Sequence, residues 1–412
     1  MEVLHPRCAG IDVHKESASV CLRTVEKGKT HQEVKAFSTM TKGLLELSDW
    51  LEKAGCTHVA MESTGVYWKP VWHVLEGHFV LVLANATHIR NVPGRKSDVS
   101  DAMWIADLLA HGLIQESFVP PEPILELRDL TRTRKQLTRE IIQHTHRIQR
   151  VLEDANVKLD SVISDVLGMS GRKILKAIIA GETKPEVLAG LGSSLLKCTR
   201  EELTEALRGK VTKHHRFLLQ QHLTLVEALE RTMADFDAQI ERALEPFRLQ
   251  VDLLTSIPGI SVIAAQVLIA EVGVDMKVFP TDGHLISWAG LCPGMNESAG
   301  KRHSTRIRKG APWLKTVLVQ CAWAASRAKG TYLQAQFHRL RSRRGPKKAA
   351  VAVAASILTG VWHILDAKVP WKDLGPEHFA SRDREAMARR LMRRIKELGY
   401  DVQIQDLDHE AA

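Results

Sequence analysis

Short blocks of apolar residues separated by polar turns run through the first 120 residues and indicate an α/β domain. The pattern predicts five strands, at Cys8–Val13, Ser17–Thr24, Glu33–Ser38, His58–Met61 and Phe79–Ala84. A helix is expected between the third and fourth strands, at Lys42–Ala54, because its apolar residues recur at helical spacing. We therefore expect residues 1–120 to form one α/β domain.

From residue 121 to about 250 the pattern changes to long helical repeats. Apolar residues between Leu127 and Ala155 fall on heptad positions, interrupted by Arg134 and His144. A second run repeats every seven residues, at Leu219, Val226, Met233, Ile240 and Phe247. Two long amphipathic helices predict a coiled coil or a helical hairpin. The pattern fits an internal bundle as well as a dimerisation arm.

Residues 251–380 are predicted to form a mostly helical domain, and residues 381–412 a charged helical tail. The segment Leu254–Ser261 carries a Pro-Gly turn before an apolar helix at Val262–Val272. A turn of this kind between two helices is like a helix-hairpin-helix element, whose backbone N–H groups bind DNA phosphates without reading sequence. Pro-Gly also occurs in simple turns, so both interpretations stay open.

The composition is that of a globular protein, with 44% hydrophobic and 25% charged residues among 412, which excludes collagen-like and disordered classes. No segment reaches the ~18 consecutive apolar residues of a membrane helix; the longest apolar run is Ala349–Ile357. The N-terminus shows no signal pattern. The six cysteines lack C-x-x-C or zinc-site spacing, so we expect reduced thiols in a cytoplasmic protein.

Positive charge is concentrated in one segment. The chain carries a net charge of +9, yet Ser298–Leu365 contains no Asp or Glu, and Lys301–Lys348 alone contains fourteen Lys and Arg. A long basic segment without acids favours an anionic partner such as nucleic acid over an ordinary solvated surface. The candidate phosphate-binding residues are Lys301, Arg302, Arg306, Arg308, Lys309, Arg341, Arg343, Arg344, Lys347 and Lys348.

Four carboxylates stand where they could share one cleft. Asp12 and Glu62 each end a predicted strand, and Asp98 and Asp101 lie one turn apart at the start of a predicted helix. In an RNase H-like domain, adjacent strands are followed by a helix, a strand, a helix and a strand. The four carboxylates stand at positions that converge in this fold. Clustered carboxylates need a counter-charge, which Mg²⁺ or Mn²⁺ supplies. Taken singly, Asp12 fits a turn, and Asp98 and Asp101 fit a helix cap.

At these residues the sequence resembles the DEDD insertion-sequence transposases. The N-terminal motifs are G-I-D-V-H-K, M-E-S-T-G-V-Y-W and K-S-D-V-S-D-A. The downstream motifs are I-P-G-I, W-A-G-L-C-P-G, E-S-A-G-K, R-K-G-A-P-W-L and R-R-G-P-K-K-A, so the matched blocks span residues 8–365. Cys292 is a mild departure, since Thr or Val is common at its position.

The resemblance implies a RuvC-like N-terminal domain, similar to Holliday-junction resolvases, and a C-terminal transposase domain. It implies that the four acids bind metal and that Ser298 is a nucleophile, with Ser304 in the same basic loop as its rival. It also implies donor and target DNA as substrates, a structured non-coding guide RNA (the bridge RNA), and dimers that pair into a tetramer. Such a protein would be associated with the nucleoid when bound to DNA.

The leading hypothesis is an RNA-guided DNA transposase that cuts and rejoins DNA to move an insertion sequence. The alternatives are a metal-dependent structure-specific nuclease and a non-catalytic nucleic-acid-binding protein. Ser298 in its motif favours the recombinase over the nuclease. The four acids argue against a simple binder, because carboxylates repel a phosphate backbone. An actin-like or sugar-kinase ATPase could share the fold, but the sequence has no Walker-type phosphate loop.

Overall fold

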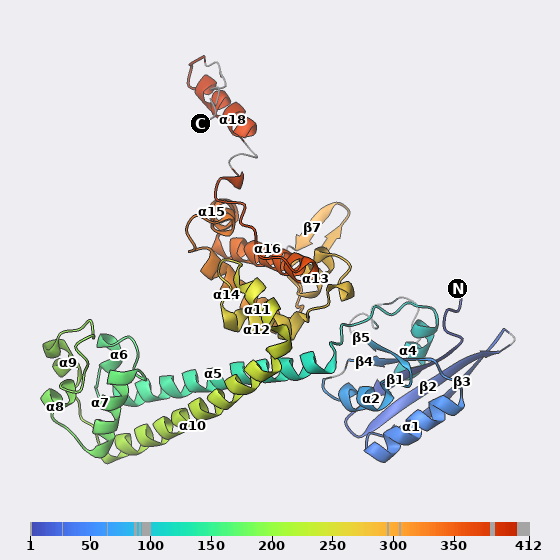
Figure 1. Ribbon diagram of the computed structural model, residues 1–412, viewed down its shortest axis with the longest axis horizontal. Coiled ribbons are helices and arrows are strands. Elements are labelled where there is room, and N and C mark those ends of the chain that lie inside the picture. Colours follow the sequence, from blue (N-terminus) through green and yellow to red (C-terminus); the bar gives the residue numbers. More distant parts are fainter. Residues whose placement is uncertain are drawn as a thin grey trace. The chain divides into compact units, whose positions relative to one another are not determined.

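The computed structural model describes residues 2–26, 28–63, 65–85, 89, 92, 100–294, 296–304, 306–379 and 384–401, with the backbone alone at 296, 297, 302, 384–388 and 390. The chain folds as two compact units, Met1–Val119 and Pro120–Ala412 (Figure 1). The first unit is α/β and the second is mostly helical, as the sequence predicts. All six cysteines are free thiols, as expected.

The first unit is built on a five-stranded mixed sheet in the order β3-β2-β1-β4-β5. The strands are β1 (Arg7–Val13), β2 (Ser17–Glu26), β3 (Lys29–Ser38), β4 (His58–Glu62) and β5 (Val80–Ala84). β1, β2 and β3 are antiparallel neighbours, whereas β4 and β5 run parallel to β1. All five predicted strands are present. β3 begins before the predicted Glu33, because it is an exposed edge strand whose polar residues conceal the pattern.

Helices cover both faces of this sheet. They are α1 (Thr41–Lys53), α2 (Trp68–Leu75) and α4 (Asp101–Ala110). α1 and α2 bury one face, and α4 lies across the other (Figure 1). The backbone N–H of Leu4, just before β1, donates to the carbonyl of Ala110 at 2.8 Å, so the carboxyl end of α4 lies at the beginning of β1. The helix therefore runs antiparallel to β1.

Gly10 in β1 brings α4 into direct contact with the sheet. A Cβ atom at this position would lie 2.3 Å from the backbone nitrogen of Ala106 and 2.4 Å from the carbonyl oxygen of Ala102. These distances are far inside van der Waals contact, so only glycine allows the helix to pack this closely. Because α4 is antiparallel to β1, its first residue lies toward the carboxyl end of the strand.

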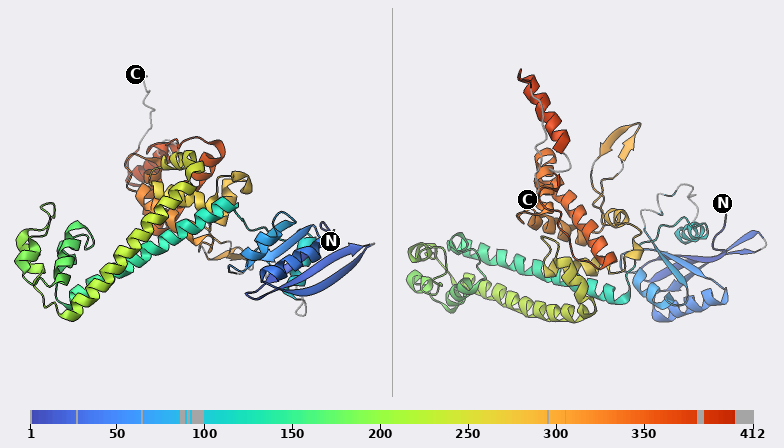
Figure 2. Two further views of the ribbon diagram at one scale, coloured as in Figure 1. Left: turned by 60° about the horizontal axis from the view of Figure 1, so that its bottom comes forward. Right: turned by 45° about the horizontal axis from the view of Figure 1, so that its top comes forward.

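The second unit begins with a long helical arm. Its elements are α5 (Glu122–Asp154), α6 (Leu159–Val162), α7 (Met169–Ala180), α8 (Pro185–Ala189), α9 (Arg200–Ala206) and α10 (Lys213–Ala243). α5 and α10 lie side by side as an antiparallel hairpin, with the short helices at its far end (Figure 2). The predicted heptad residues Leu219, Val226 and Ile240 are buried within the chain. Met233 and Phe247 are half-buried, so most of the seam packs within the chain, as the helical hairpin alternative requires.

The rest of the second unit includes a group of helices that packs around the long helix α16. The elements are η1 (Glu245–Phe247), α11 (Arg248–Thr255), α12 (Val262–Val272), η2 (Met276–Val278), α13 (Asp282–Trp288), β6 (Asn296–Ser298), β7 (Lys301–Ser304), α14 (Pro312–Ala325), α15 (Tyr332–Arg344), α16 (Pro346–Ala367) and α18 (Arg384–Glu397). α16 packs against α13, α14 and α15. By length and composition α16 could cross a membrane, but 56% of its apolar window is buried inside the protein, as in a core helix.

The Pro-Gly turn does join two helices, α11 and α12, as the sequence predicts. Gly259 has a φ of 92°, and a Cβ there would lie 2.6 Å from backbone atoms of Cys321 and Ala325. The turn is therefore packed against α14. The first turn of α12 remains accessible, with Val262 55% and Ile263 50% exposed. A contact between this turn and DNA phosphate stays a prediction.

Candidate functional site

Two of the predicted acids lie side by side at one edge of the sheet. β1 and β4 are parallel, with Ile11 opposite Met61, so the following residues, Asp12 and Glu62, are neighbours at the carboxyl ends of the strands. Ile11 and Met61 pack on the face that α1 covers. Because side chains alternate along a strand, Asp12 and Glu62 belong to the opposite face, which α4 covers.

Helix α4 brings a third acid to this edge. Asp101 is the first residue of α4, and the close contact at Gly10 sets the helix over β1. The cap of the helix is Ser100, whose Oγ accepts a hydrogen bond from the backbone N–H of Met103 at 3.3 Å. Asp101 is therefore not the capping residue, although its place in the first turn still suits the positive end of the helix dipole. Asp98 lies outside the described residues.

The carboxylates at this edge are partly buried. The Asp12 side chain is 20% exposed, and Glu62 is 7% exposed. His14 lies beside Asp12, with its Nε2 3.3 Å from the Asp12 Oδ2. Burial of neighbouring carboxylates is unfavourable without a compensating positive charge. An all-oxygen donor set of this kind suits a hard divalent cation such as Mg²⁺ or Mn²⁺.

The described acids share an edge without forming a closed ligand cluster. Among the residues that the structure describes, no three His, Cys, Asp or Glu side chains are close enough together to hold a metal ion. The predicted quartet includes Asp98, which lies outside that set. The donor chemistry therefore fits a divalent metal, whereas the complete metal site stays a prediction.

The basic loop that the sequence predicts around Ser298 is a β-hairpin, and Ser298 lies at its tip. β6 and β7 pair antiparallel, and Ser298 is opposite Lys301. The two residues between them, Ala299 and Gly300, have φ angles of 50° and 71°. Two successive positive φ angles define a type I′ turn, which suits the twist of a hairpin. Ser298 is exposed at this tip, and the hairpin projects from the helices around it (Figures 1 and 2).

The rival residue, Ser304, occupies a different position in the same hairpin. It pairs with Asn296 at the base, and it is only partly exposed. Its Oγ accepts a hydrogen bond from the backbone N–H of Arg306 at 3.2 Å. The Ser304 hydroxyl thus stabilises the turn that leaves β7, whereas Ser298 stands at the accessible end.

The base of the hairpin is fixed to the helical unit. The backbone N–H of Gly294 donates to the Arg306 carbonyl at 2.8 Å. The ammonium group of Lys315 donates to the carbonyls of Arg308 at 2.8 Å and Lys309 at 2.6 Å. Burial lowers the pKa of Lys315 below its ordinary value. These bonds hold the polypeptide after β7 against the first turns of α14.

The predicted phosphate-binding residues are on the surface. The exposed members are Lys301, Arg306, Arg308, Lys309, Arg341, Arg343, Arg344, Lys347 and Lys348, and the side chain of Arg302 is not described. Five of them surround Gly345, the single residue between α15 and α16, so that connection is densely basic. Exposed cations without nearby acids in the sequence can approach a polyanion at little desolvation cost.

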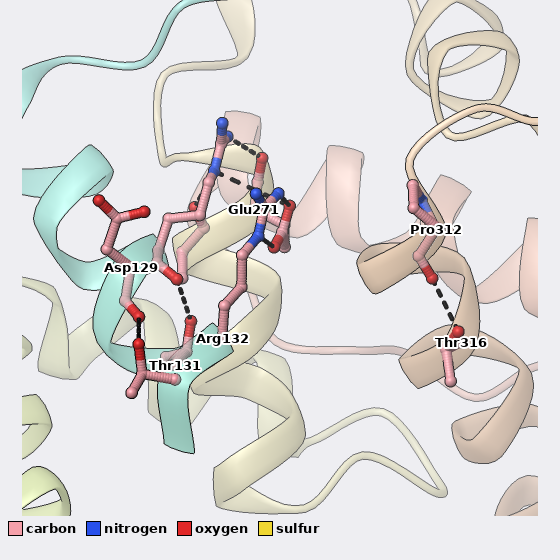
Figure 3. Close-up of polar contacts among 9 residues, drawn as sticks. Asp129, Thr131, Arg132, Glu271, Pro312 and Thr316 are labelled. Atoms are coloured by element: carbon pink, nitrogen blue, oxygen red, sulfur yellow. Dashed lines mark hydrogen bonds and ion pairs between the residues drawn. The ribbon is translucent and has the colours of Figure 1, made fainter. Parts of the chain in front are cut away.

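Sequence reasoning missed one buried acid, Glu271. It is 1% exposed at the end of α12. Arg132 of α5 binds both of its carboxylate oxygens, at 2.7 and 2.8 Å, while Arg128 donates to its backbone carbonyl at 2.6 Å (Figure 3). Burial lowers the pKa of Arg128. The available signal was Glu271 as the single charged residue in the mostly apolar segment Val262–Val272.

Comparison with known proteins assigns both units to the same class. Residues 9–157 match the DEDD transposase model of IS110 elements, and residues 251–338 match the transposase model of the IS116/IS110/IS902 family. The insertion element IS110 uncharacterized 43.6 kDa protein of Streptomyces coelicolor is 28% identical over 268 residues. That alignment covers 57% of this chain and 62% of the relative, which is less than two thirds of the relative's length. The four predicted acids lie in the first match, and Ser298 lies in the second.

Proposed function

Because the chain belongs to the IS110 family of DEDD transposases, we propose that it is an RNA-guided recombinase that cuts and rejoins DNA to move an insertion sequence. The observation that carries this proposal is the position of Asp12, Glu62 and Asp101 at one edge of the sheet. The strand order β3-β2-β1-β4-β5, with two antiparallel and two parallel pairings, supports an RNase H-like, RuvC-like unit around that edge.

In this proposal Asp12, Glu62, Asp98 and Asp101 hold Mg²⁺, or Mn²⁺ in its place. When bound, such ions supply the positive charge that activates an attacking oxygen and stabilises a leaving one in phosphoryl transfer. His14 is the neighbour that helps to keep the Asp12 carboxylate in position, because its Nε2 lies 3.3 Å from the Asp12 Oδ2. The partial burial of Asp12 and Glu62 strengthens their attraction for a cation by limiting the screening by water.

Ser298 is the proposed nucleophile. Its Oγ attacks the scissile phosphorus and gives up its proton, the bond from phosphorus to a sugar oxygen breaks, and that oxygen takes up a proton and leaves as a sugar hydroxyl. The phosphoserine that forms conserves the energy of the phosphodiester for rejoining. A serine hydroxyl is a weak nucleophile until its proton is accepted, and we assign that activation to the acidic site. The exposure of Ser298 at the hairpin tip and the engagement of the Ser304 hydroxyl support this choice.

The exposed basic residues are proposed to bind the backbones of donor DNA, target DNA and a structured guide RNA. Phosphate contacts position a nucleic acid without reading its sequence, so specificity would come from base pairing with the RNA. As the family resemblance implies, we propose dimers that pair into a tetramer, acting on the nucleoid in the cytoplasm. Because Leu219, Val226 and Ile240 of the α10 seam are buried within the chain, we place the contacts of this assembly on other surfaces.

Conservative changes of the acids test the proposal. Asp12→Asn, Glu62→Gln, Asp98→Asn and Asp101→Asn should each abolish recombination, because the amide keeps the shape of the side chain but removes its charge. Chelation by EDTA should do the same, and added Mg²⁺ should restore activity. Asp49→Asn is the matched control, since Asp49 is exposed on α1 and should leave recombination unchanged. Full strand exchange in EDTA, or by the folded acid variants, would contradict the proposal.

A further inference from the structure

A pocket of about 290 Å³ lies in the second unit where α5, α12 and α14 meet. Figure 3 shows Arg132 and Glu271 on one side of this region and Pro312 and Thr316 on the other. Lys135 and Arg139 of α5 and Trp313 of α14 also line the pocket. The acidic edge, the hairpin and the basic α15–α16 connection contribute no residue to it, so it belongs to none of the sites above.

The pocket carries positive charge that its own residues do not neutralise. The charge of its one acid, Glu271, is taken up by the two bonds from Arg132 and by Arg128, whose Nε is 3.8 Å from the second carboxylate oxygen. Lys135 and Arg139 form no ion pair with any residue that the structure describes. Two uncompensated cations beside a satisfied glutamate favour an anionic ligand.

Trp313 gives the same pocket a flat aromatic wall. Its ring is only partly exposed, and the guanidinium carbons of Arg139 and Arg132 lie 5.1 and 5.7 Å from its centroid. Val267 and Val317 extend the apolar surface beside it. An indole bordered by cations stacks well on a nucleobase, because the base presents a π-face and the adjoining phosphate meets the cations.

We propose that this pocket binds one unpaired nucleotide of a nucleic-acid strand, with its base stacked on Trp313 and its phosphate bound by Lys135 and Arg139. The volume is at the lower limit of typical ligand sites, which suits one nucleotide better than a base-paired duplex. Arg132 is fixed by Glu271, whereas Arg139 is exposed, so its guanidinium can turn from the Trp313 ring to the phosphate. This inference rests on the proposed function only in taking nucleic acid as the partner.

Binding of short labelled oligonucleotides to the full chain, followed by fluorescence anisotropy, tests the pocket. Trp313→Ala should weaken binding of single strands about tenfold and leave duplex binding unchanged. Trp313→Phe should retain most of the affinity because it keeps a stacking ring. Lys135→Gln and Arg139→Gln should each lower the log–log salt slope by about 0.7. The control is Arg150→Gln, an exposed arginine of α5 that does not line the pocket, and it should leave both quantities unchanged.

Binding of oligouridylate and of oligothymidylate is measured separately to show whether the strand is RNA or DNA. The nucleic acid that occupies the pocket should bind more tightly and lose more affinity in Trp313→Ala. An oligonucleotide carrying a photoreactive 5-iodouracil should cross-link to Trp313, as peptide mapping would show. Unchanged single-strand affinity in a folded Trp313→Ala protein would overturn the inference, and so would equal losses in Arg150→Gln. Neither readout needs DNA cleavage, so failure here is distinct from failure of the proposed recombination chemistry.

Discussion

Replacing Gly10 with alanine tests how the fold assembles the acidic edge. The added Cβ would meet the Ala106 nitrogen at 2.3 Å and the Ala102 oxygen at 2.4 Å. Both are backbone atoms of α4, so no side-chain rotation relieves the contact, and the helix must move away from β1 by about 1 Å to reach van der Waals distance. Overpacking of this kind costs about 1–3 kcal/mol of folding stability.

The same displacement should impair catalysis more than it impairs folding. Asp101 begins α4, so a movement of the helix carries this carboxylate away from Asp12 and Glu62. A misplacement of about 1 Å can reduce a catalysed rate about a hundredfold. The assay is the rate of DNA cleavage under saturating Mg²⁺, measured with the denaturation midpoint of the same protein.

The matched control is Gly283→Ala. Among the described residues, a Cβ at Gly283 would touch only the Thr281 Oγ1, at 3.5 Å, which is ordinary contact. Within a helix this change should be neutral or stabilise by up to ~1 kcal/mol. If Gly10→Ala showed the stability and cleavage rate of the parent protein, the close packing of α4 on β1 and its role in placing Asp101 would both be refuted.

Two further predictions concern the arm. Val226→Asp should destabilise the protein by at least ~3 kcal/mol in chemical denaturation, because it buries an unpaired charge at a position with 0% exposure. The neighbouring Leu225→Asp, at 47% exposure, should change stability by less than ~0.5 kcal/mol. Equal effects of the two changes would contradict the internal seam. The Nδ1 atoms of His144 and His222 lie 3.2 Å apart, and burial lowers the pKa of both side chains below 6.5. The unfolded chain therefore binds protons at these residues more readily than the folded protein, and the folding stability should fall as pH drops below about 6.5. His222→Gln should flatten that fall in pH-dependent denaturation, and the exposed His146→Gln should not; the same slope in all three proteins would refute the linkage.

Much of the fold could be predicted because buried positions are occupied by apolar residues in recognisable patterns along the sequence. In β1, the residues around Ile11 are buried on both faces, so a strand reads as a short continuous apolar run. β3 has no such apolar run along its first half, because nearly every side chain of this strand is exposed. The heptads of α10 predicted a helical partner but could not identify it, since the same apolar stripe packs equally well on α5 or on another chain.

The candidate site was predictable where strand ends define it. Asp12 and Glu62 lie at the carboxyl ends of parallel strands, and these ends must share an edge. The hairpin under Ser298 could not be predicted, because Ala-Gly is not among the dipeptides favoured in a type I′ turn. The Arg132–Glu271 pair joins residues 139 positions apart, and no local pattern reports a contact of that kind.

The central claim, a recombinase that uses a serine nucleophile, is tested most directly by trapping its covalent intermediate. The protein is incubated with guide RNA, Mg²⁺ and a nicked DNA substrate that cannot be rejoined, and then denatured. We predict a DNA–protein adduct that survives denaturation and maps to Ser298. It should be lost in Ser298→Ala without weaker RNA binding, and retained in Ser304→Ala. DNA cleavage that continues in Ser298→Ala, with no adduct in either protein, would contradict the account and identify a metal-dependent nuclease instead.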